Sequence, residues 1–314
     1  MKTYLIAALA AFAAAAVLTA CLMPLLKRLK AGQYILGYVK EHKDKSGTPT
    51  MGGLAFITAI IVVALCFCGL ENNVLNLTLV IVGGFTVVGF FDDFLKIYRK
   101  ENEGLKPYQK ILFQTAIALI AAIYCYVNGM TRLYLPFSGG VSFDIKWGII
   151  PVVLFVFLAT VNCVNLTDGL DGLAGGTSLA YFAFFGAVLA LNAQSLSMIC
   201  FTAVGALAAF LLFNCNKAAI FMGDTGSLAL GGLIACVSVF SSNTLYIPVL
   251  GIMFVISGLT VIIQVIYYKR TKRRVFLMAP LHHHFQMKGF TECKISYAYA
   301  LITSLIGILC LIFL

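Results

Sequence analysis

Acidic residues are scarce in this chain of 314 residues. Only 12 are Asp or Glu, against 22 Lys or Arg, and charged residues of both signs make up 11% of the sequence. Hydrophobic residues make up 61%, and the mean hydropathy is +0.98. These values exclude an ordinary soluble domain and indicate an integral membrane protein.

Other absences narrow the class of protein further. The ten cysteines include no C-x-x-C pair and most lie in apolar runs, so we expect neither a disulfide framework nor a zinc site. The basic residues are dispersed between apolar runs without a soluble recognition module, so we expect no nucleic-acid partner. The glycine-rich segment Gly47–Gly53 lacks the Gly-Lys-Ser/Thr of a P-loop and is typical of a helix start.

Long apolar runs are spread along the whole chain, which predicts a single transmembrane domain over 1–314. We expect an all-α polytopic membrane protein with about ten spans, most of them close to the roughly 20 residues that cross a bilayer. The predicted spans are 3–26, 54–70, 74–91, 111–127, 147–164, 173–192, 196–213, 228–242, 245–267 and 295–314. The span at 228–242 is the weakest, because it is short and contains two adjacent glycines.

The distribution of charge predicts the orientation of these spans. If the ten spans alternate, 19 of the 22 basic residues fall in the loops of one face. Only Lys2, Arg132 and Lys146 fall on the other face. The positive-inside rule makes the basic face cytoplasmic and places both termini outside. The net charge of +10 follows from this topology, and it also favours phosphate-bearing substrates or anionic lipid.

Two adjacent carboxylates, Asp92 and Asp93, stand where the third apolar run gives way to Lys96. They could mark the charged end of a helix, but Lys or Arg suits a helix C-terminus better. A pair of carboxylates is suited to binding a divalent cation, or to dividing its work between a cation and a proton. Because acids at a membrane surface are costly, we favour a functional role.

A compact polar segment, Asn165–Gly172, separates the fifth and sixth runs and contains two Asp and two Gly. It could be a glycine-rich turn that caps the next helix. A tight loop of this kind also directs backbone N–H groups and carboxylates toward a ligand, as a nucleotide site requires. The topology places this segment on the same face as Asp92 and Asp93.

A third acidic motif, Phe221–Ser227, precedes the eighth run and contains Asp224. Its Thr and Ser could simply cap the following helix. Asp-Thr-Gly also occurs in aspartic proteases, but an intramembrane protease needs a second aspartate buried within a span, and we expect none here. A hard cation held by Asp224 and Asp92 or Asp93, bridging phosphate oxygens, is the simpler interpretation.

The segment 269–290 joins the last two runs. Its basic first half predicts an amphipathic helix at the membrane surface. Its second half carries His282, His283 and His284 after Pro280. Three consecutive histidines cannot face one way on a helix, so all three cannot bind one metal ion. One or two could donate hydrogen bonds to phosphate or transfer protons.

These motifs, in this order, resemble those of the phospho-N-acetylmuramoyl-pentapeptide transferase family, which makes the first membrane-bound intermediate of bacterial peptidoglycan. The matching segments are Gly47–Gly53, Phe91–Asp93, Asn165–Gly172, Phe221–Ser227 and Pro280–Phe285. The resemblance implies a ten-span fold in the bacterial plasma membrane with a cytoplasmic active site, and a homodimer. It implies transfer of phospho-N-acetylmuramoyl-pentapeptide from its UDP carrier (UDP-MurNAc-pentapeptide) to undecaprenyl phosphate, with release of UMP and dependence on Mg²⁺.

The resemblance also implies roles for individual residues. The metal would be held by Asp224, with Asn165 assisting and Asp92 and Asp93 close by. The uracil pocket would be formed by Gly169, Leu170, Asp171 and Phe221, with Asn214 and Gln264 nearby. The nucleotide cleft would be lined by Lys45, Thr50 and Asp168, and the diphosphate or muramoyl region by His282, His283 and His284. Asp92 or Asp93 would serve as base on the lipid phosphate or as nucleophile in a two-step path; we favour direct attack.

Two other functions have to be weighed. A transferase that passes a sugar-1-phosphate such as N-acetylglucosamine-1-phosphate to a polyprenyl phosphate would share the acidic motifs, and differs mainly in the loop after the ninth run. The sequence Pro280–Phe285 favours the muramoyl substrate. A transporter would also be polytopic, but its polar residues would lie in the middle of spans.

Overall fold

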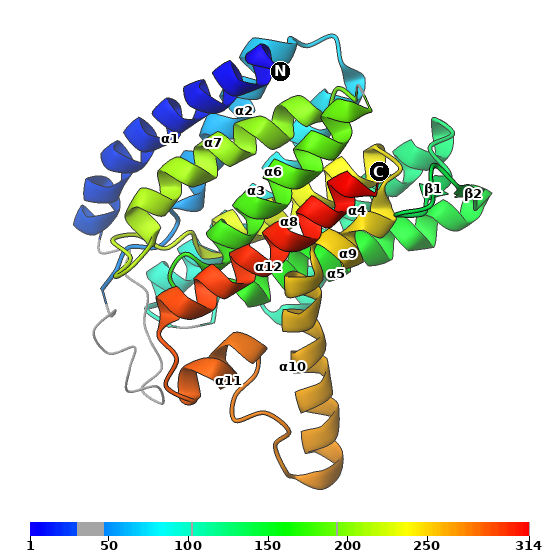
Figure 1. The fold of residues 1–314 in the computed structure, drawn as a ribbon. Helices are drawn as coiled ribbons and strands as arrows, with labels where there is room; N and C mark the ends of the chain where they lie inside the picture. The colour runs from blue at the N-terminus through cyan, green and yellow to red at the C-terminus, as the bar shows by residue number, and fades with distance from the viewer. Residues whose placement is uncertain (30–46, 102, 193, 314) are drawn as a thin grey trace.

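The computed structural model of the chain describes residues 1–29, 47–101, 103–192 and 194–313. In these ranges the chain is a bundle of long helices with one small hairpin (Figure 1). The prediction of an all-α polytopic membrane protein is confirmed. Nine described helical segments are long and apolar enough to cross a membrane: α1 (Lys2–Arg28), α3 (Asn73–Arg99), α4 (Pro107–Val127), η2 with α5 (Lys146–Gly148, Ile149–Thr167), α6 (Leu173–Leu191), α7 (Ser197–Asn214), α8 (Gly223–Phe240), α10 (Ile252–Thr271) and α12 (Glu292–Ile312). The predicted span at 54–70 is the shorter apolar helix α2 (Gly53–Cys68).

Helix α8 corresponds to the span that the sequence predicted least clearly, and it is the centre of the bundle. Every residue from Thr225 to Phe240 is buried, and the helix packs against α2, α3 and α5. Its two adjacent glycines account for this position. A methyl group at Gly231 would lie 2.5 Å from the backbone of Val161, and one at Gly232 would overlap the ring of Phe85. The two glycines that weaken the hydrophobic pattern of this span therefore allow α5 and α3 to pack closely against α8.

Two of the predicted span boundaries are wrong. Helix α3 does not end near residue 91 but continues to Arg99, because Lys96 stands one turn after the acidic pair and balances its charge. The span predicted over 245–267 is interrupted: η3 (Thr244–Tyr246) and α9 (Ile247–Leu250) precede Gly251, the N-cap residue of α10. Pro248 lies in the first turn of α9, where its missing N–H has no intrahelical partner to lose, and Gly251 disfavours a continuous helix from α9 into α10.

The helix expected in the basic first half of the segment 269–290 is also absent. Residues 272–280 are not helical, and the helix in this segment is α11 (Leu281–Met287), which carries the histidines. The chain leaves α10 at Lys272, which has a left-handed backbone. Gln264 then binds the backbone of Val275 and Phe276, at 3.0–3.1 Å, so these residues fold back along α10.

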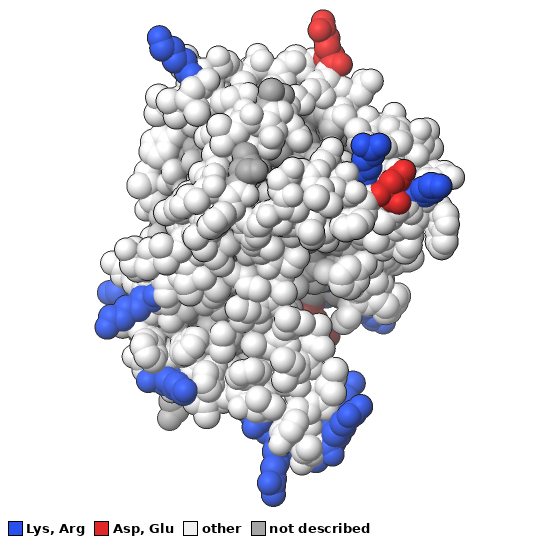
Figure 2. Space-filling model, turned by 45° about the vertical axis from the view of Figure 1, so that its right-hand side comes forward, with Lys and Arg blue, Asp and Glu red and all other residues white. Residues whose placement is uncertain are grey.

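A small antiparallel hairpin lies at the opposite end of the bundle from α11 (Figure 1). It pairs β1 (Arg132–Tyr134) with β2 (Ser142–Asp144), with Leu133 opposite Phe143. Both chain ends lie toward this upper side. Figure 2 shows a broad uncharged band across the molecule, with basic side chains gathered below it and isolated charges above. This pattern is the one expected of a bundle that spans a bilayer with its basic loops on one face.

Candidate active site

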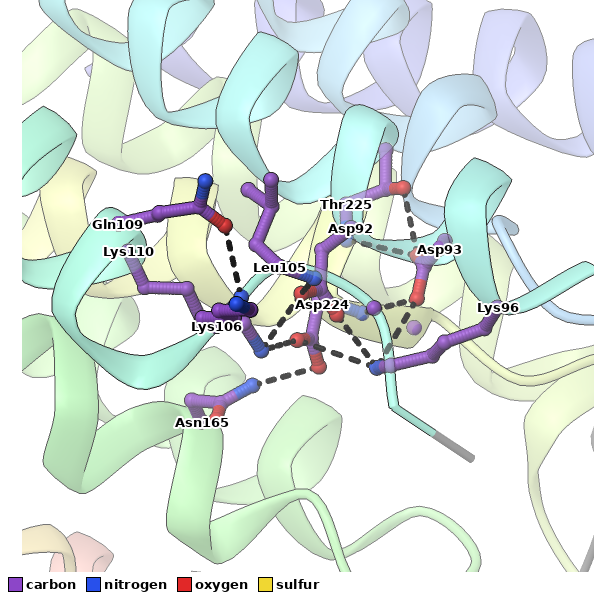
Figure 3. A network of polar contacts seen from close by, with 12 residues as sticks. Asp92, Asp93, Lys96, Leu105, Lys106, Gln109, Lys110, Asn165, Asp224 and Thr225 are labelled. Carbon is purple, nitrogen blue, oxygen red and sulfur yellow. Dashed lines mark hydrogen bonds and ion pairs between the residues drawn. The ribbon is translucent and has the colours of Figure 1, made fainter. Parts of the chain in front are cut away.

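Three carboxylates from two helices meet at the lower end of α3 and α8. Asp92 and Asp93 come from α3 and Asp224 from the first turn of α8, and one ligand oxygen from each lies within 4.8 Å of the other two (Figure 3). Asp224 was expected in the loop before the eighth span, and it is instead helical. Asp92 is 0% and Asp93 2% exposed, so both carboxylates are buried within the protein near the C-terminal end of α3.

Asp93 is used to hold the N-terminus of α8. Its carboxylate accepts hydrogen bonds from the backbone N–H groups of Asp224 (3.2 Å) and Thr225 (2.9 Å), and from the Thr225 hydroxyl (2.7 Å). These N–H groups belong to the first turn of a helix, which has no partner for them within itself. Asp93 therefore does for α8 what an N-cap residue normally does, but from a neighbouring helix.

Two lysines lie among the carboxylates. The Lys96 ammonium is 2.6 Å from Asp92 and 3.2 Å from Asp224, and the Lys110 ammonium, from α4, is 2.9 Å from Asp92 and 2.6 Å from Asp224. Figure 3 shows both ammonium groups directed at the same carboxylates. Three negative charges thus meet two positive charges, and the cluster keeps an excess of negative charge that suits a divalent cation.

Asn165, near the end of α5, completes the group. Its amide nitrogen donates to the Asp224 carboxylate at 3.0 Å and to the Ser227 hydroxyl at 2.8 Å. The hydroxyl in turn donates to the backbone oxygen of Gly223 at 3.0 Å. The carboxylate of Asp224 is therefore held by α3, α4 and α5 at once, which fixes its position without filling all its acceptor sites.

Glycines allow these helices to come this close. A methyl group at Gly89 of α3 would overlap the backbone oxygen of Asp224, and one at Gly104 would lie 2.5 Å from the backbone oxygen of Asp92. Gly223 has a positive φ of 69° and leaves no room for a side chain between Asp93 and Thr50. The site is thus assembled from backbones in direct contact.

The segment 165–172 leads away from the carboxylates. Asp171 accepts a hydrogen bond from the Ala218 backbone N–H at 2.9 Å, and its own N–H donates to Glu292 at 3.0 Å. The N–H of Gly172 donates to the Asn214 side chain at 3.1 Å, whose amide donates to the Ile220 oxygen at 2.8 Å. Asp171 and Asn214 therefore connect the predicted nucleotide loop to the chain before α8.

Asp168, which follows α5, is partly buried and close to other acids. Burial and the carboxylates of Asp224, Asp93 and Asp171 raise its pKa to about 8. The shift favours the protonated carboxyl group, which can donate a hydrogen bond as well as accept one.

The segment before α2 forms a wall of the site. The N–H of Phe221 donates to the Pro49 oxygen at 2.8 Å, and the N–H of Gly52 donates to the Phe221 oxygen at 2.8 Å. Thr50 is buried and its hydroxyl lies beside Gly223, while the side chain of Phe221 is half-buried. Lys45 lies outside the described residues.

The histidines divide into two groups, as expected of consecutive residues on a helix. Nε2 of His282 and of His283 both lie against Gly169, where a methyl group would be 2.5 and 2.9 Å from them. His284 turns away, and its Nδ1 accepts a hydrogen bond from the Leu277 N–H at 3.1 Å. His282 is fully buried, and burial together with His283 lowers its pKa to about 3. A neutral His282 can donate a hydrogen bond but does not carry charge at neutral pH.

Comparison with known proteins identifies the family. The family model for glycosyl transferase family 4 matches residues 74–242, and the phospho-N-acetylmuramoyl-pentapeptide-transferase signature 1 matches residues 45–57. A phospho-N-acetylmuramoyl-pentapeptide-transferase of Clostridioides difficile (strain 630) is 40% identical over 304 residues, which cover 94% of this chain and 93% of the relative. The chain belongs to the phospho-N-acetylmuramoyl-pentapeptide-transferase family. Two further transferases of the same name are similarly close to this chain. The one from Staphylococcus epidermidis (strain ATCC 12228 / FDA PCI 1200) is 41% identical over 307 residues, which cover 93% of this chain and 94% of the relative. The one from Bacillus subtilis (strain 168) is 40% identical over 307 residues, which cover 95% of this chain and 94% of the relative.

The two matched segments cover most of the candidate site. The family match contains the acidic cluster and the predicted nucleotide loop, and the signature contains Lys45 and Thr50. The histidines and Gln264 lie outside both segments. Gln264 is on α10, with its amide bound to the backbone of 275–276 rather than to the loops that carry Asp171 and Phe221.

Three residues that contact the candidate site, Lys96, Lys110 and Glu292, were not predicted from the sequence. The two lysines entered the prediction only as basic residues of one face. The spacing of Lys96, four residues after Asp92 on one helix, could have shown the contact. No comparable signal exists for Lys110 or Glu292, because their contacts depend on how α4 and α12 pack.

Proposed function

We propose that this transferase moves phospho-N-acetylmuramoyl-pentapeptide from UDP-MurNAc-pentapeptide to undecaprenyl phosphate, giving lipid I and UMP in peptidoglycan synthesis. The name of the relatives, phospho-N-acetylmuramoyl-pentapeptide-transferase, supports the substrate class. The observation that carries the proposal is the cluster of Asp92, Asp224, Lys96 and Lys110 at one end of an apolar bundle. Such a site can serve a charged nucleotide and a membrane-bound lipid phosphate together.

We propose that this end of the bundle faces the cytoplasm of a bacterium. The support is the gathering of basic side chains on the side of α11 and the end of α10. The same orientation puts both chain ends outside. Association into a homodimer is part of the proposal and rests on the family alone.

The residues of the cluster fit Mg²⁺. The ion prefers oxygen ligands and few protein carboxylates, and Asp224 and Asp92 offer such oxygens beside the side chain of Asn165. When bound, Mg²⁺ would neutralise charge on the diphosphate oxygens. The lysine ammonium groups lie on the same carboxylate oxygens, so they and the cation compete for one set of ligands.

The chain's own residues then divide the remaining work. Lys96 and Lys110 donate hydrogen bonds to phosphate oxygens as they leave the carboxylates, which neutralises charge that develops during phosphoryl transfer. Asp93 accepts three hydrogen bonds from α8 and is nearly fully buried, so we assign it the positioning of Asp224. Asp92 is the member of the pair that faces the lysines, and we assign it the contact with the lipid phosphate.

In this scheme an oxygen of the lipid phosphate attacks the phosphorus that bears the muramoyl sugar. The bond from that phosphorus to the bridging oxygen breaks, and UMP leaves with the electron pair. The buried His282 is neutral and hydrogen-bonds phosphate or sugar oxygens near Gly169. Leu170, Asp171 and Phe221 receive the uridine.

A reconstituted assay tests the proposal directly. Purified protein receives UDP-MurNAc-pentapeptide and undecaprenyl phosphate with and without Mg²⁺, and UMP release is measured. We expect UMP release to require both substrates and the cation. The variant Asp224→Asn should release no UMP although the protein stays folded. Release with UDP-N-acetylglucosamine but not with the muramoyl donor would overturn the proposed substrate in favour of a sugar-1-phosphate transferase.

A further inference from the structure

A hydrogen-bond relay outside the acidic cluster joins the predicted nucleotide loop to the helix that carries the histidines. It begins at the backbone N–H of Asp171, which donates to Oε2 of Glu292 at 3.0 Å. Oε1 of the same carboxylate accepts from Nε2 of Gln286 at 3.3 Å. Oε1 of Gln286 lies 3.0 Å from Nδ1 of His283. The relay therefore connects three elements, which are the loop after α5, the first turn of α12, and α11.

Glu292 determines the direction of every hydrogen bond in the relay. A carboxylate has no proton to give and can only accept. The atom of Gln286 that faces it is therefore the amide nitrogen, because the amide oxygen would meet the carboxylate oxygen with no proton between them. The amide oxygen of Gln286 then faces His283, and it too can only accept. Nδ1 of His283 therefore carries a proton.

A proton on Nδ1 determines what the other ring nitrogen of His283 can do. In a neutral imidazole one nitrogen carries the proton and the other accepts hydrogen bonds. Nε2 of His283 is therefore the acceptor of the neutral ring. This atom lies against the nucleotide loop at Gly169, where a methyl group would be 2.9 Å from it. The relay thus directs a hydrogen-bond acceptor toward the loop.

The relay is held in place by the packing of α11 and α12. Gln286 is 7% exposed and stands one turn after His283 on α11. Glu292 is the first residue of α12, and one turn later the Ser296 hydroxyl donates to the backbone oxygen of Asp171 at 2.8 Å. The start of α12 thus binds both the N–H and the C=O of Asp171. Because Oε2 of Glu292 is bound to the loop, Oε1 is the atom that faces Gln286.

We propose that Glu292 and Gln286 are positioning residues that fix the proton of His283 on Nδ1. Nε2 of His283 then accepts a hydrogen bond from a hydroxyl or amide N–H group of UDP-MurNAc-pentapeptide, a step that rests on the proposed function. In this tautomer Nε2 has no proton to donate to a phosphate oxygen. Glu292 also holds the N–H of Asp171, so one carboxylate sets both the nucleotide loop and the histidine that faces it.

Glu292→Gln tests the relay with a side chain of the same shape. The oxygen of the new amide is needed at the N–H of Asp171, so its nitrogen faces Gln286. Gln286 then turns its own oxygen toward position 292 and its nitrogen toward His283, which moves the imidazole proton to Nε2. The double variant Q286E/E292Q exchanges the two side chains and keeps the net charge. Its carboxylate at position 286 accepts from both neighbours, so the proton should return to Nδ1.

Nitrogen chemical shifts of ¹⁵N-labelled histidine distinguish a protonated ring nitrogen from a bare one, and His283→Gln identifies the signals of His283. Spectra are recorded at about pH 8.5, well above the ordinary pKa of histidine. We expect the proton on Nδ1 in wild type and in Q286E/E292Q, and on Nε2 in Glu292→Gln. Glu71→Gln, the same change at an exposed residue between α2 and α3, is the matched control and should resemble wild type.

Two spectroscopic results would overturn the relay. One is a proton on Nε2 in the wild type, which decides the matter even if Glu292→Gln does not fold. The other is the same tautomer in wild type and in folded Glu292→Gln. A ring of His283 that carries both protons at this pH would overturn its role as an acceptor.

The kinetics of UMP release test the contact with substrate. In Glu292→Gln two hydrogen-bond donors would face each other, so we expect KM for UDP-MurNAc-pentapeptide to rise about tenfold or more, with a smaller change in kcat. Q286E/E292Q should return KM to within about threefold of wild type. An unchanged KM in Glu292→Gln, or a fall in kcat alone, would overturn the contact with substrate. Absence of UMP release from the wild type would instead count against the proposed function, because the tautomer is measured without turnover.

Discussion

Asp93 and Thr225, from helices α3 and α8, are joined by two hydrogen bonds to one carboxylate oxygen, of 2.9 Å from the backbone N–H and 2.7 Å from the hydroxyl. No side-chain cap for α8 comes from its own N-cap position at Met222. Asp93 instead caps the N-terminus of α8, and Asp224 lies in the first turn of that helix. The position of the proposed metal ligand therefore depends on a carboxylate that need not touch the metal.

Substitutions in the Asp92–Asp93 pair should separate positioning from chemistry. Asp93→Ala leaves buried N–H and hydroxyl donors without an acceptor, so we expect a loss of about 1–3 kcal/mol in the free energy of unfolding, together with loss of UMP release. Asp92→Asn should reduce UMP release at least a hundredfold with a smaller change in thermal stability, because its two lysine partners retain Asp224 and the amide oxygen can still accept from the Leu105 N–H. Thermal unfolding in detergent and the UMP assay check both. An unchanged melting temperature for Asp93→Ala would contradict the capping role.

Two glycines on α3 provide a matched pair for the contact between α3 and α8. A methyl group at Gly89 would overlap the backbone of Asp224, whereas one at Gly83 has no atom within 4 Å. We expect Gly89→Ala to destabilise the protein by about 1–3 kcal/mol and to abolish activity. Gly83→Ala should be neutral or up to about 1 kcal/mol stabilising, since alanine favours helix. Similar melting temperatures for the two variants would show that the helices can move apart without cost.

The sequence predicted the parts of the site that topology determines. Alternating spans place Asp92 and Asp224 on one face although 132 positions separate them, and the structure brings their carboxylates together. The sequence did not predict that Asp93 would turn to α8 while Asp92 turned to the lysines, because that choice depends on the rotation of α3. Hydropathy predicted the number of apolar helices but not the break at Gly251. The residues on both sides of the break are apolar, so hydropathy does not change where the helix is interrupted.

Lys110 lies where a cation would lie, so its removal should affect metal binding and catalysis in opposite directions. A unit charge at about 4 Å contributes roughly 1 kcal/mol even in bulk water. We therefore expect Lys110→Met to bind Mn²⁺ about fivefold or more tightly, as measured by electron paramagnetic resonance, while UMP release falls. Lys106→Met, an exposed lysine one turn earlier, is the control and should change neither. Weaker Mn²⁺ binding by Lys110→Met would argue that Lys110 supports the metal site rather than competing for it.

The buried His282 should make the protein sensitive to acid. Its pKa is about 3 in the folded protein against 6.5 for an exposed histidine, because burial and His283 disfavour the charged ring. Between these values the unfolded chain binds more protons than the folded one. The free energy of unfolding should therefore fall as pH is lowered from about 6.5 toward 3, by up to roughly 1.4 kcal/mol per pH unit. His282→Gln cannot take up this proton, so its melting temperature should depend less on pH across that window. Parallel pH profiles for His282→Gln and wild type would show that folding does not lower the pKa of His282, and burial would then not be what keeps the ring neutral.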